Sequence, residues 1–137
     1  GAAASFNNPY GVAVSPDAGT VYVADAANNR IRKIDTSDGD TTTLAGSGTF
    51  GFADGTGAAA SFNFPRSVAV SPDGVTLYVA DSDGDTTTLA GSGTGTFADG
   101  TGTAASFNYP TGVAMSPNSM TVYVVDADNH RIRQVTA

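Results

Sequence analysis

The residues of this chain with side chains suited to acid–base or metal chemistry are few. Its 13 acidic residues are all aspartates, its one histidine is His130, and it has no cysteine. A catalytic triad or a zinc site needs several such side chains gathered in one place. His130 has no second histidine to join it, and in the repeat described below Asn29 takes its position. We interpret His130 as a turn residue, and we predict no catalytic residues, no metal site and no cofactor.

An aspartate recurs at the end of an apolar run, as Asp25, Asp81 and Asp126. Recurring acids are candidate metal ligands, but an acid that returns in every copy of a repeat favours a repeated structural task. We expect these three carboxylates to accept hydrogen bonds from the backbone of the following turn. Alternatively, they pair with the guanidinium groups of Arg30 and Arg131.

Three further kinds of segment suggest chemistry. Segment 81–85, Asp-Ser-Asp-Gly-Asp, resembles the start of a calcium loop, but the glutamate that closes such a loop is absent from the chain. Segments 54–57 and 99–102, both Asp-Gly-Thr-Gly, would need a following helix and a lysine to hold a phosphate. We interpret them as turns in which glycine supplies a positive φ. The threonine runs 41–43 and 86–88 predict strands, and they are also candidate acceptors of O-linked sugars.

These residues are set in a sequence that occurs three times, and such a repeat determines the whole architecture. Ala-Ser-Phe-Asn-x-Pro begins at Ala4, Ala60 and Ala105. Each occurrence leads into an apolar run that alternates with period two, a turn that opens with Ser-Pro, and a second alternating run that ends at the recurring aspartate. Alternation of this kind predicts strands, and proline presets the backbone for the turn.

The first copy predicts one complete four-stranded antiparallel meander, which is the unit of a β-propeller. Its third strand is the charged segment 30–34, and its fourth strand is the threonine-rich segment 41–45. We therefore predict an all-β fold made of propeller blades. The chain is expected to be a single propeller segment over residues 1–137, with repeats at about 5–60, 61–104 and 106–137.

The copies are unequal in length. Phe6 and Phe62 are 56 positions apart, whereas Phe62 and Phe107 are 45 positions apart. The 11 residues missing from the second copy correspond to residues 26–36 of the first, which include its whole third strand. Either the second blade is irregular, or the sequence lacks a segment that the natural protein has. The third copy ends after its third strand, so we expect about 2.5–3 blades, with the second blade lacking its third strand.

The repeated pattern resembles the NHL repeat. Pro-Tyr-Gly-Val-Ala-Val at 9–14, Tyr-Val-Ala-Asp at 22–25 and Asn-Arg-Ile-Arg-Lys-Ile at 29–34 match that repeat closely, and the match recurs in register. The resemblance implies a propeller, usually six-bladed, that most often binds a ligand or a protein. Some related six-bladed propellers are lyases or lactonases that use metal ligands in a central channel. One histidine, with no glutamate or cysteine, does not furnish such a site.

The charge balance limits the partners. Six basic and 13 acidic residues give a net charge of −7. Nucleic acid and anionic membrane surfaces attract proteins through Lys and Arg, so we expect neither a nucleic-acid partner nor membrane insertion. No run approaches the roughly 18 apolar residues of a membrane span. The acidic balance fits a protein that stays soluble outside cells, and we expect an extracellular or cell-surface location.

Propellers typically need four to eight blades to close, and a three-bladed piece exposes two apolar blade faces. We therefore expect a non-enzymatic structural or scaffold module that associates with itself as a ring or filament, or that is part of a longer NHL-repeat protein. The alternative is a propeller that binds a ligand or another protein through its loops. Residues that differ in one copy would mark such a surface, and Arg66 and Met115 are the candidates.

Overall fold

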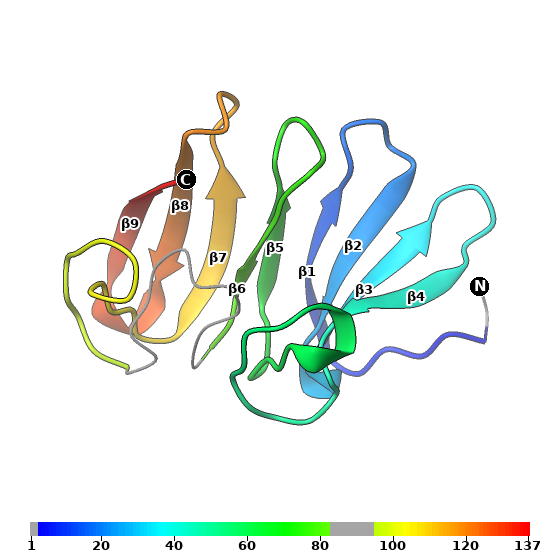
Figure 1. Cartoon of the computed structure of the whole chain (residues 1–137), viewed down its shortest axis with the longest axis horizontal. Helices are drawn as coiled ribbons and strands as arrows, with labels where there is room; N and C mark the ends of the chain where they lie inside the picture. Colours follow the sequence, from blue (N-terminus) through cyan, green and yellow to red (C-terminus); the bar gives the residue numbers. More distant parts are fainter. Residues whose placement is uncertain (1–2, 83–94) are drawn as a thin grey trace.

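The three copies of the repeat fold into three antiparallel sheets that stand side by side (Figure 1). The computed structural model describes residues 3–82 and 95–137. The first copy forms blade 1, whose strands are hydrogen bonded in chain order. These strands are β1 (Pro9–Val14), β2 (Thr20–Asp25), β3 (Arg30–Asp35) and β4 (Thr41–Ala45). The predicted four-stranded meander is confirmed.

The second copy forms a smaller sheet, blade 2, from β5 (Ser67–Val70) and β6 (Leu77–Ala80). At the equivalent point blade 1 continues from β2 into its third strand, whereas no described residue adds a third strand to blade 2. The prediction of an all-β fold made of propeller blades is confirmed, and the described residues of blade 2 supply two strands. The strand predicted over residues 86–88 lies outside the described residues.

The third copy forms blade 3, with β7 (Pro110–Met115), β8 (Thr121–Asp126) and β9 (Arg131–Thr136) paired in that order. The second and third strands of blades 1 and 3 are joined by short 3₁₀ turns, η1 (Ala26–Asn28) and η3 (Ala127–Asn129). Each turn ends on a left-handed residue, Asn29 with φ 51° and His130 with φ 55°. Asn and His adopt this region more readily than most residues, so His130 lies in a turn.

The two faces of each blade carry different side chains, because successive residues of a strand point to opposite sides. In blade 1, Val12 lies opposite Val23, and Ala13 lies opposite Tyr22. We call the side of Val12 the valine face and the side of Tyr22 the tyrosine face. The same names are used for the equivalent positions of blades 2 and 3.

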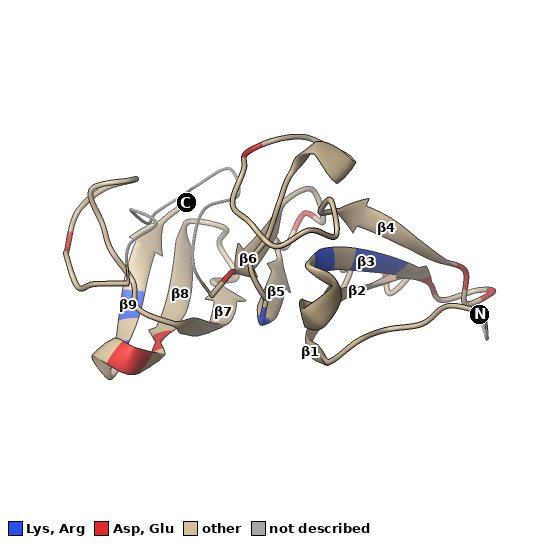
Figure 2. Cartoon of the chain, turned by 90° about the horizontal axis from the view of Figure 1, so that it is seen from below, with Lys and Arg blue, Asp and Glu red and all other residues tan. Residues whose placement is uncertain are grey.

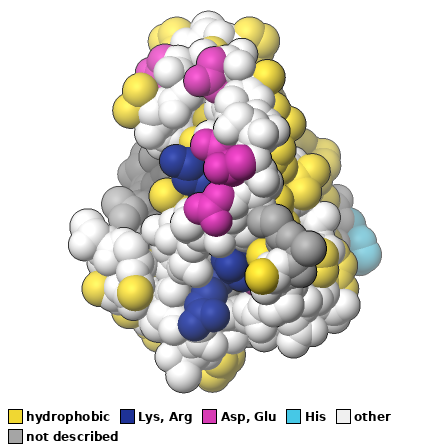
Figure 3. Space-filling model, turned by 90° about the vertical axis from the view of Figure 1, so that its right-hand side faces the viewer, with side chains coloured by type: hydrophobic (Ala, Val, Ile, Leu, Met, Phe, Trp, Pro, Cys, Tyr) yellow, Lys and Arg dark blue, Asp and Glu magenta, His cyan; other side chains and the backbone are white. Residues whose placement is uncertain are grey.

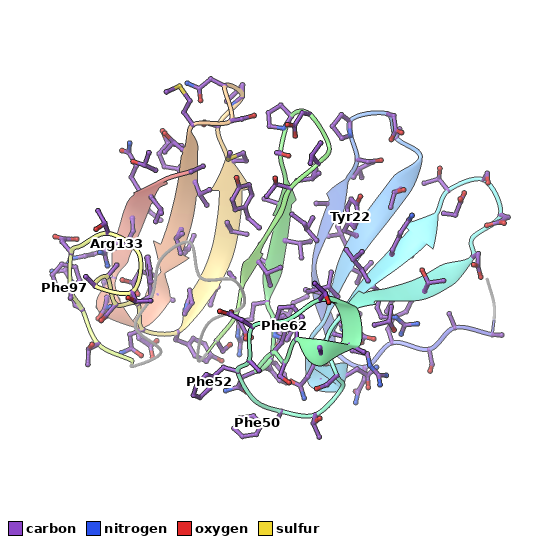
Figure 4. The ribbon with its side chains drawn as sticks, in the orientation of Figure 1. Tyr22, Phe50, Phe52, Phe62, Phe97 and Arg133 are labelled. Atoms are coloured by element: carbon purple, nitrogen blue, oxygen red, sulfur yellow. The ribbon has the colours of Figure 1, made fainter. Side chains whose placement is uncertain are left out.

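The hydrophobic core lies where the tyrosine face of blade 1 meets the valine face of blade 2. Its buried residues are Ala24 and Ile31 of blade 1, Val68 of blade 2, and Phe62 of the link between them. Partly buried side chains of both faces surround them, namely Ala13, Tyr22, Ala45, Leu77 and Val79. Figure 4 shows Phe62 at the base of this junction. Stacking of one blade on the next therefore supplies the apolar burial that a single sheet cannot.

Blades 1 and 2 approach closely at Gly11. A Cβ atom at this position would lie 2.6 Å from the Cα atom of Ser67. The links that follow blades 1 and 2 are each held by one β-bridge, Ala53 to Ser61 and Ala98 to Ser106, and the first link contains the 3₁₀ turn η2 (Gly57–Ala59). Among the described residues, no helix is long and apolar enough to cross a lipid bilayer.

Candidate interaction surfaces

The recurring aspartate of blade 1 is buried at the end of β2 and organises the turn that follows. Asp25 is 0% exposed. It accepts hydrogen bonds from the Asn7 backbone N–H at 2.8 Å, from Asn28 Nδ2 at 2.9 Å and from Arg32 Nη1 at 3.2 Å. Three donors satisfy a carboxylate that burial would otherwise penalise. We call this arrangement the Asp–Arg clasp.

Blade 3 repeats the clasp. Asp126 is 0% exposed and accepts hydrogen bonds from the Asn108 N–H at 2.7 Å, from Asn129 Nδ2 at 3.0 Å and from Arg133 Nη1 at 3.0 Å. The basic residues of both clasps lie on β3 and β9, where Figure 2 shows them as blue bands. The same contacts in two blades indicate a structural task, as the sequence suggested.

The expected arginine partners were wrong by two positions. Arg30 lies directly opposite Asp25 in the register of β2 and β3, and Arg32 lies opposite Val23, on the same face. A long side chain at the diagonal position reaches across to the carboxylate, while Arg30 donates to the Ser47 carbonyl oxygen at 3.4 Å. In blade 3, Arg131 likewise donates to the Asn129 carbonyl oxygen at 3.1 Å. Period-two alternation places Arg30 and Arg32 on the same face, so it does not distinguish them, and the strand register together with side-chain reach selects Arg32.

The equivalent residue of blade 2, Asp81, is 7% exposed and accepts a hydrogen bond from the Asn63 N–H at 2.8 Å. The second copy lacks residues equivalent to 26–36, so it contains no counterpart of Arg32. Of the calcium-like segment 81–85, residues 83–85 lie outside the described residues. No three His, Cys, Asp or Glu residues of the described ranges 3–82 and 95–137 gather in a way that would hold a metal ion.

The two Asp-Gly-Thr-Gly segments lie in the links, and Gly57 and Gly102 both have φ 55°, as turns require. The second link also makes contacts that sequence reasoning missed. Arg133 Nη2 pairs with Asp99 at 2.7 Å, and the guanidinium carbons of Arg131 and Arg133 lie 4.0 and 4.8 Å from the centre of the Phe97 ring. Figure 4 shows Phe97 beside Arg133. This link is therefore fastened to the outer part of blade 3.

Arg66, one of the two copy-specific residues, joins all three copies at one end of the blades. Its guanidinium carbon lies 4.9, 5.2 and 4.2 Å from the ring centres of Tyr10, Phe64 and Tyr109, in that order. It donates hydrogen bonds to the Tyr109 hydroxyl and, at 3.0 Å, to Ser82 Oγ. We call these residues the junction cluster. The sequence singled out Arg66 but gave no sign that three aromatic rings would surround it.

The other copy-specific residue, Met115, lies within β7 opposite Val122 and is partly buried. It occupies the position that Val14 has in blade 1. Its place on the valine face of blade 3, which faces blade 2, gives it a packing role.

The two outer blade faces expose apolar side chains. On the valine face of blade 1, Tyr10, Val12 and Val14 are 56%, 65% and 52% exposed. On the tyrosine face of blade 3, Tyr123, Val125 and Ile132 are 45%, 37% and 67% exposed. The equivalent positions inside the molecule are covered: Val68 is 4% exposed and Ile31 is 1% exposed. The outer faces of blades 3 and 1 are thus equivalent to the tyrosine face of blade 1 and the valine face of blade 2, which pack together inside the molecule.

A family model for the NHL repeat matches residues 6–34 and 107–135. The matched segments contain the first three strands of blade 1 and of blade 3 almost to their last residues. The second copy, which lacks residues equivalent to 26–36, lies outside both segments.

Two curated proteins are similar to part of the chain. Protein SUPPRESSOR OF QUENCHING 1, chloroplastic, of Arabidopsis thaliana is 37% identical over 81 residues, which is 59% of this chain and 8% of that protein. NHL repeat-containing protein 2 of Homo sapiens is 34% identical over 79 residues, which is 57% of this chain and 11% of that protein. The chain therefore spans about a tenth of the length of these relatives.

Solved structures share the fold. A protein of unknown function from Bacteroides thetaiotaomicron superposes with a TM-score of 0.78 at 24% identity, covering 98% of this chain and 37% of that one. An auxiliary nutrient binding protein from the same organism gives a TM-score of 0.74 at 22% identity, covering 90% and 36%. A chain of a nidogen/laminin complex gives 0.57 at 15% identity, covering 93% and 48%.

Proposed function

Because this chain is built from NHL repeats, we propose that it is a non-enzymatic scaffold whose outer blades join one copy of the chain to the next. The NHL propeller fold supports a binding or scaffold role. The observation that favours joining of copies is the match between the two outer faces. The valine face of blade 1 and the tyrosine face of blade 3 correspond to the surfaces that already pack together between blades 1 and 2.

The packing between blades 1 and 2 shows how the two outer faces would pack between copies of the chain. Ile31 on the tyrosine face of blade 1 is covered by blade 2, whereas its counterpart on blade 3, Ile132, is exposed. Val68 is likewise covered by blade 1, and its counterpart Val12 is exposed. Burial of one Val or Ile side chain stabilises a contact by about 1.5–3 kcal/mol. Several such side chains on each face offset the cost of association.

Head-to-tail joining of unlike faces gives a closed ring if the rotation closes and a filament if it does not. Propellers typically close with four to eight blades. We therefore propose that further copies of this chain, or further repeats of a longer NHL-repeat protein, complete a ring, with a filament as the open form of the same joint.

Charge substitutions on single faces test this proposal. Val12→Asp blocks the valine face of blade 1, and Ile132→Asp blocks the tyrosine face of blade 3. In sedimentation velocity we expect the wild type to associate with rising concentration and each variant alone to remain a monomer. An equimolar mixture of the two variants retains one open face of each kind and should form a 1:1 dimer.

Val75→Asp is the matched control, because Val75 is 82% exposed but lies in the β5–β6 turn, away from both faces. This variant should associate like the wild type. A wild type that stays monomeric at all concentrations, or a mixture of blocked variants that does not pair, would overturn the proposal. Circular dichroism of every variant shows whether the blades remain folded.

The alternative role is that of a propeller that binds a ligand or another protein. It draws support from the copy-specific junction cluster and from fold relatives whose names include an auxiliary nutrient binding protein and a nidogen/laminin complex. A monomeric wild type in the sedimentation experiment would favour this role.

An extracellular location also belongs to the proposal, because a net charge of −7 fits a protein that stays soluble outside cells. The threonines at 41–43 lie on β4, partly or fully exposed, where O-linked sugars would be accessible. A mass of the natural, secreted protein equal to that of its sequence would exclude such sugars, and its absence from the culture medium would exclude secretion.

A further inference from the structure

The junction cluster lies at the end of the molecule where the first strands of the three blades begin. These strands, β1, β5 and β7, contact one another in that order, and Figure 2 views the blades from the end at which they start. Phe64 and Arg66 come just before β5, and Tyr109 comes directly before β7. Tyr109 is 38% exposed, and the other two are partly exposed. Two separate sheets thus present aromatic rings and a cation on one surface.

The backbone at both aromatic residues is left-handed. The φ angle is 57° at Phe64 and 55° at Tyr109, a region that bulky residues rarely adopt and that Asn adopts more readily. Their counterpart in blade 1 is Asn8, with φ 51°. An asparagine therefore makes the same turn, so the fold does not require a ring at this position. Strained residues of this kind are concentrated at sites that hold ligands.

Arg66 is held on one side and open on the other. Its Nε donates to Ser82 Oγ at 3.0 Å, and Ser82 is buried. Its Nη2 donates to the Tyr109 hydroxyl, whereas its Nη1 donates to no described residue. Because the Tyr109 oxygen accepts this hydrogen bond, the proton of the same hydroxyl is available for another acceptor. A ligand that lies on the rings would therefore meet two positioned donors at their edge.

We propose that the junction cluster binds a neutral pyranose sugar. A pyranose with equatorial hydroxyls has an apolar C–H face that packs on the rings of Phe64 and Tyr109. The hydroxyl oxygens at the rim of the sugar accept hydrogen bonds from Arg66 Nη1 and from the Tyr109 hydroxyl. A few polar groups beside aromatic side chains are typical of small-molecule sites. This binding goes beyond the scaffold role and does not depend on it.

The charge of the protein favours a neutral ligand over an anionic one. An aromatic carboxylate would also stack on the rings and pair with Arg66, but it would approach a chain with a net charge of −7. Figure 3 shows acidic side chains gathered at the outer edge of blade 1. A sugar uses the same rings and donors without this repulsion, so it is the ligand that we favour.

The test uses cellotriose, whose glucose rings carry only equatorial hydroxyls. It is titrated into the Ile132→Asp chain, so that association between copies does not contribute, and binding is followed by NMR. We expect saturable shifts at the amides of Phe64, Arg66 and Tyr109, with a Kd of about 1 mM. Amides at the outer end of blade 3, such as that of Tyr123, should not shift.

Substitutions that copy the residue of blade 1 give folded variants without the rings. Phe64→Asn and Tyr109→Asn each place the residue type of Asn8 in the same left-handed turn, so the backbone is retained. Each should weaken cellotriose binding about ten-fold. Phe50→Asn is the matched control, because it removes a ring that is 74% exposed but lies outside the cluster. It should leave binding unchanged.

Three results would each overturn the proposal: no saturable shift with cellotriose, unchanged binding in the Tyr109→Asn variant, and tighter binding of benzoate than of cellotriose at the same amides. Circular dichroism shows that each variant is folded. The titration reports on a chain that carries a blocked outer face, so its outcome is separate from that of the sedimentation experiment.

Discussion

A carboxylate and a serine close the turn between the first two strands of blades 1 and 2. Ser15 Oγ donates to Asp17 at 2.5 Å, and the Gly19 N–H donates to the same carboxylate at 3.0 Å. These hydrogen bonds, the serine hydroxyl's first, lower the pKa of Asp17 from its ordinary value, and the same contacts in blade 2 lower the pKa of Asp73. Blade 3 makes this turn with Asn118, whose Oδ1 accepts from Ser116 Oγ at 2.7 Å. An amide therefore fits the turn without a titrating group.

The lowered pKa values of Asp17 and Asp73 lead us to expect that the stability of the protein depends on pH. A carboxyl group whose pKa is lower in the folded than in the unfolded chain adds to the free energy of unfolding above its unfolded pKa, and that contribution is lost as the pH falls through its folded pKa. We expect the wild type to lose stability below about pH 4. The double variant Asp17→Asn, Asp73→Asn should lose less over the same range. Urea unfolding from pH 7 to pH 2 measures both, and parallel curves would show that these turns do not contribute.

The junction cluster shows how a single residue connects blades. Arg66 precedes β5, yet its guanidinium lies against Tyr10 of blade 1 and against Tyr109, next to β7. Arg66→Thr introduces the residue type that the third copy has at this position. Contacts of a cation with aromatic rings contribute about 0.5–2 kcal/mol each, so we expect a loss of about 1–3 kcal/mol in the free energy of unfolding by urea. Lys33→Ala, at an exposed position of β3, is the control and should have little effect; an equal loss in both variants would argue against the cluster.

At the scale of elements, the third strand decides whether a repeat is complete. In blade 1, β3 lies between β2 and β4, brings Ile31 into the core and carries the arginine of the clasp. Among the described residues, blade 2 has two strands and no third, and the link before blade 2 also differs from the link before blade 3. Phe52, the counterpart of Phe97, is 66% exposed and projects outward beside Phe50 (Figure 4). The arginines that cover Phe97 in blade 3 have no counterparts in the second copy, because that copy lacks residues equivalent to 26–36.

Restoring the strand should stabilise the protein. Insertion of the sequence of residues 26–36 between Asp81 and Ser82 gives the second copy the length of the first. We expect the free energy of unfolding by urea to rise by about 2 kcal/mol, because an isoleucine is buried and Phe52 gains arginine neighbours. An insertion of 11 Gly and Ser residues is the control and should give no gain. If the two insertions behave alike, blade 2 is not a blade that lacks one strand.

At the scale of the whole molecule, stability comes from stacking unlike faces. The buried cluster between blades 1 and 2 consists of side chains from both blades and one link, and neither sheet encloses it alone. The same geometry leaves one valine face and one tyrosine face uncovered, at opposite ends of the row of blades (Figure 1). Self-association, tested above with Val12→Asp and Ile132→Asp, follows from this arrangement and not from any single residue.

The sequence by itself determined the local structure. Period-two alternation placed strands such as β1 and β2, and Ser-Pro placed their turns. The unequal repeat lengths showed that the second copy lacks residues equivalent to 26–36. These features depend on residues close together in the chain, so local patterns encode them. The tertiary structure decided which arginine reaches each buried aspartate, which rings surround Arg66, and how blade 3 holds the link before it. Those contacts join residues that are distant in sequence, and they depend on strand register and blade stacking, which no short pattern specifies.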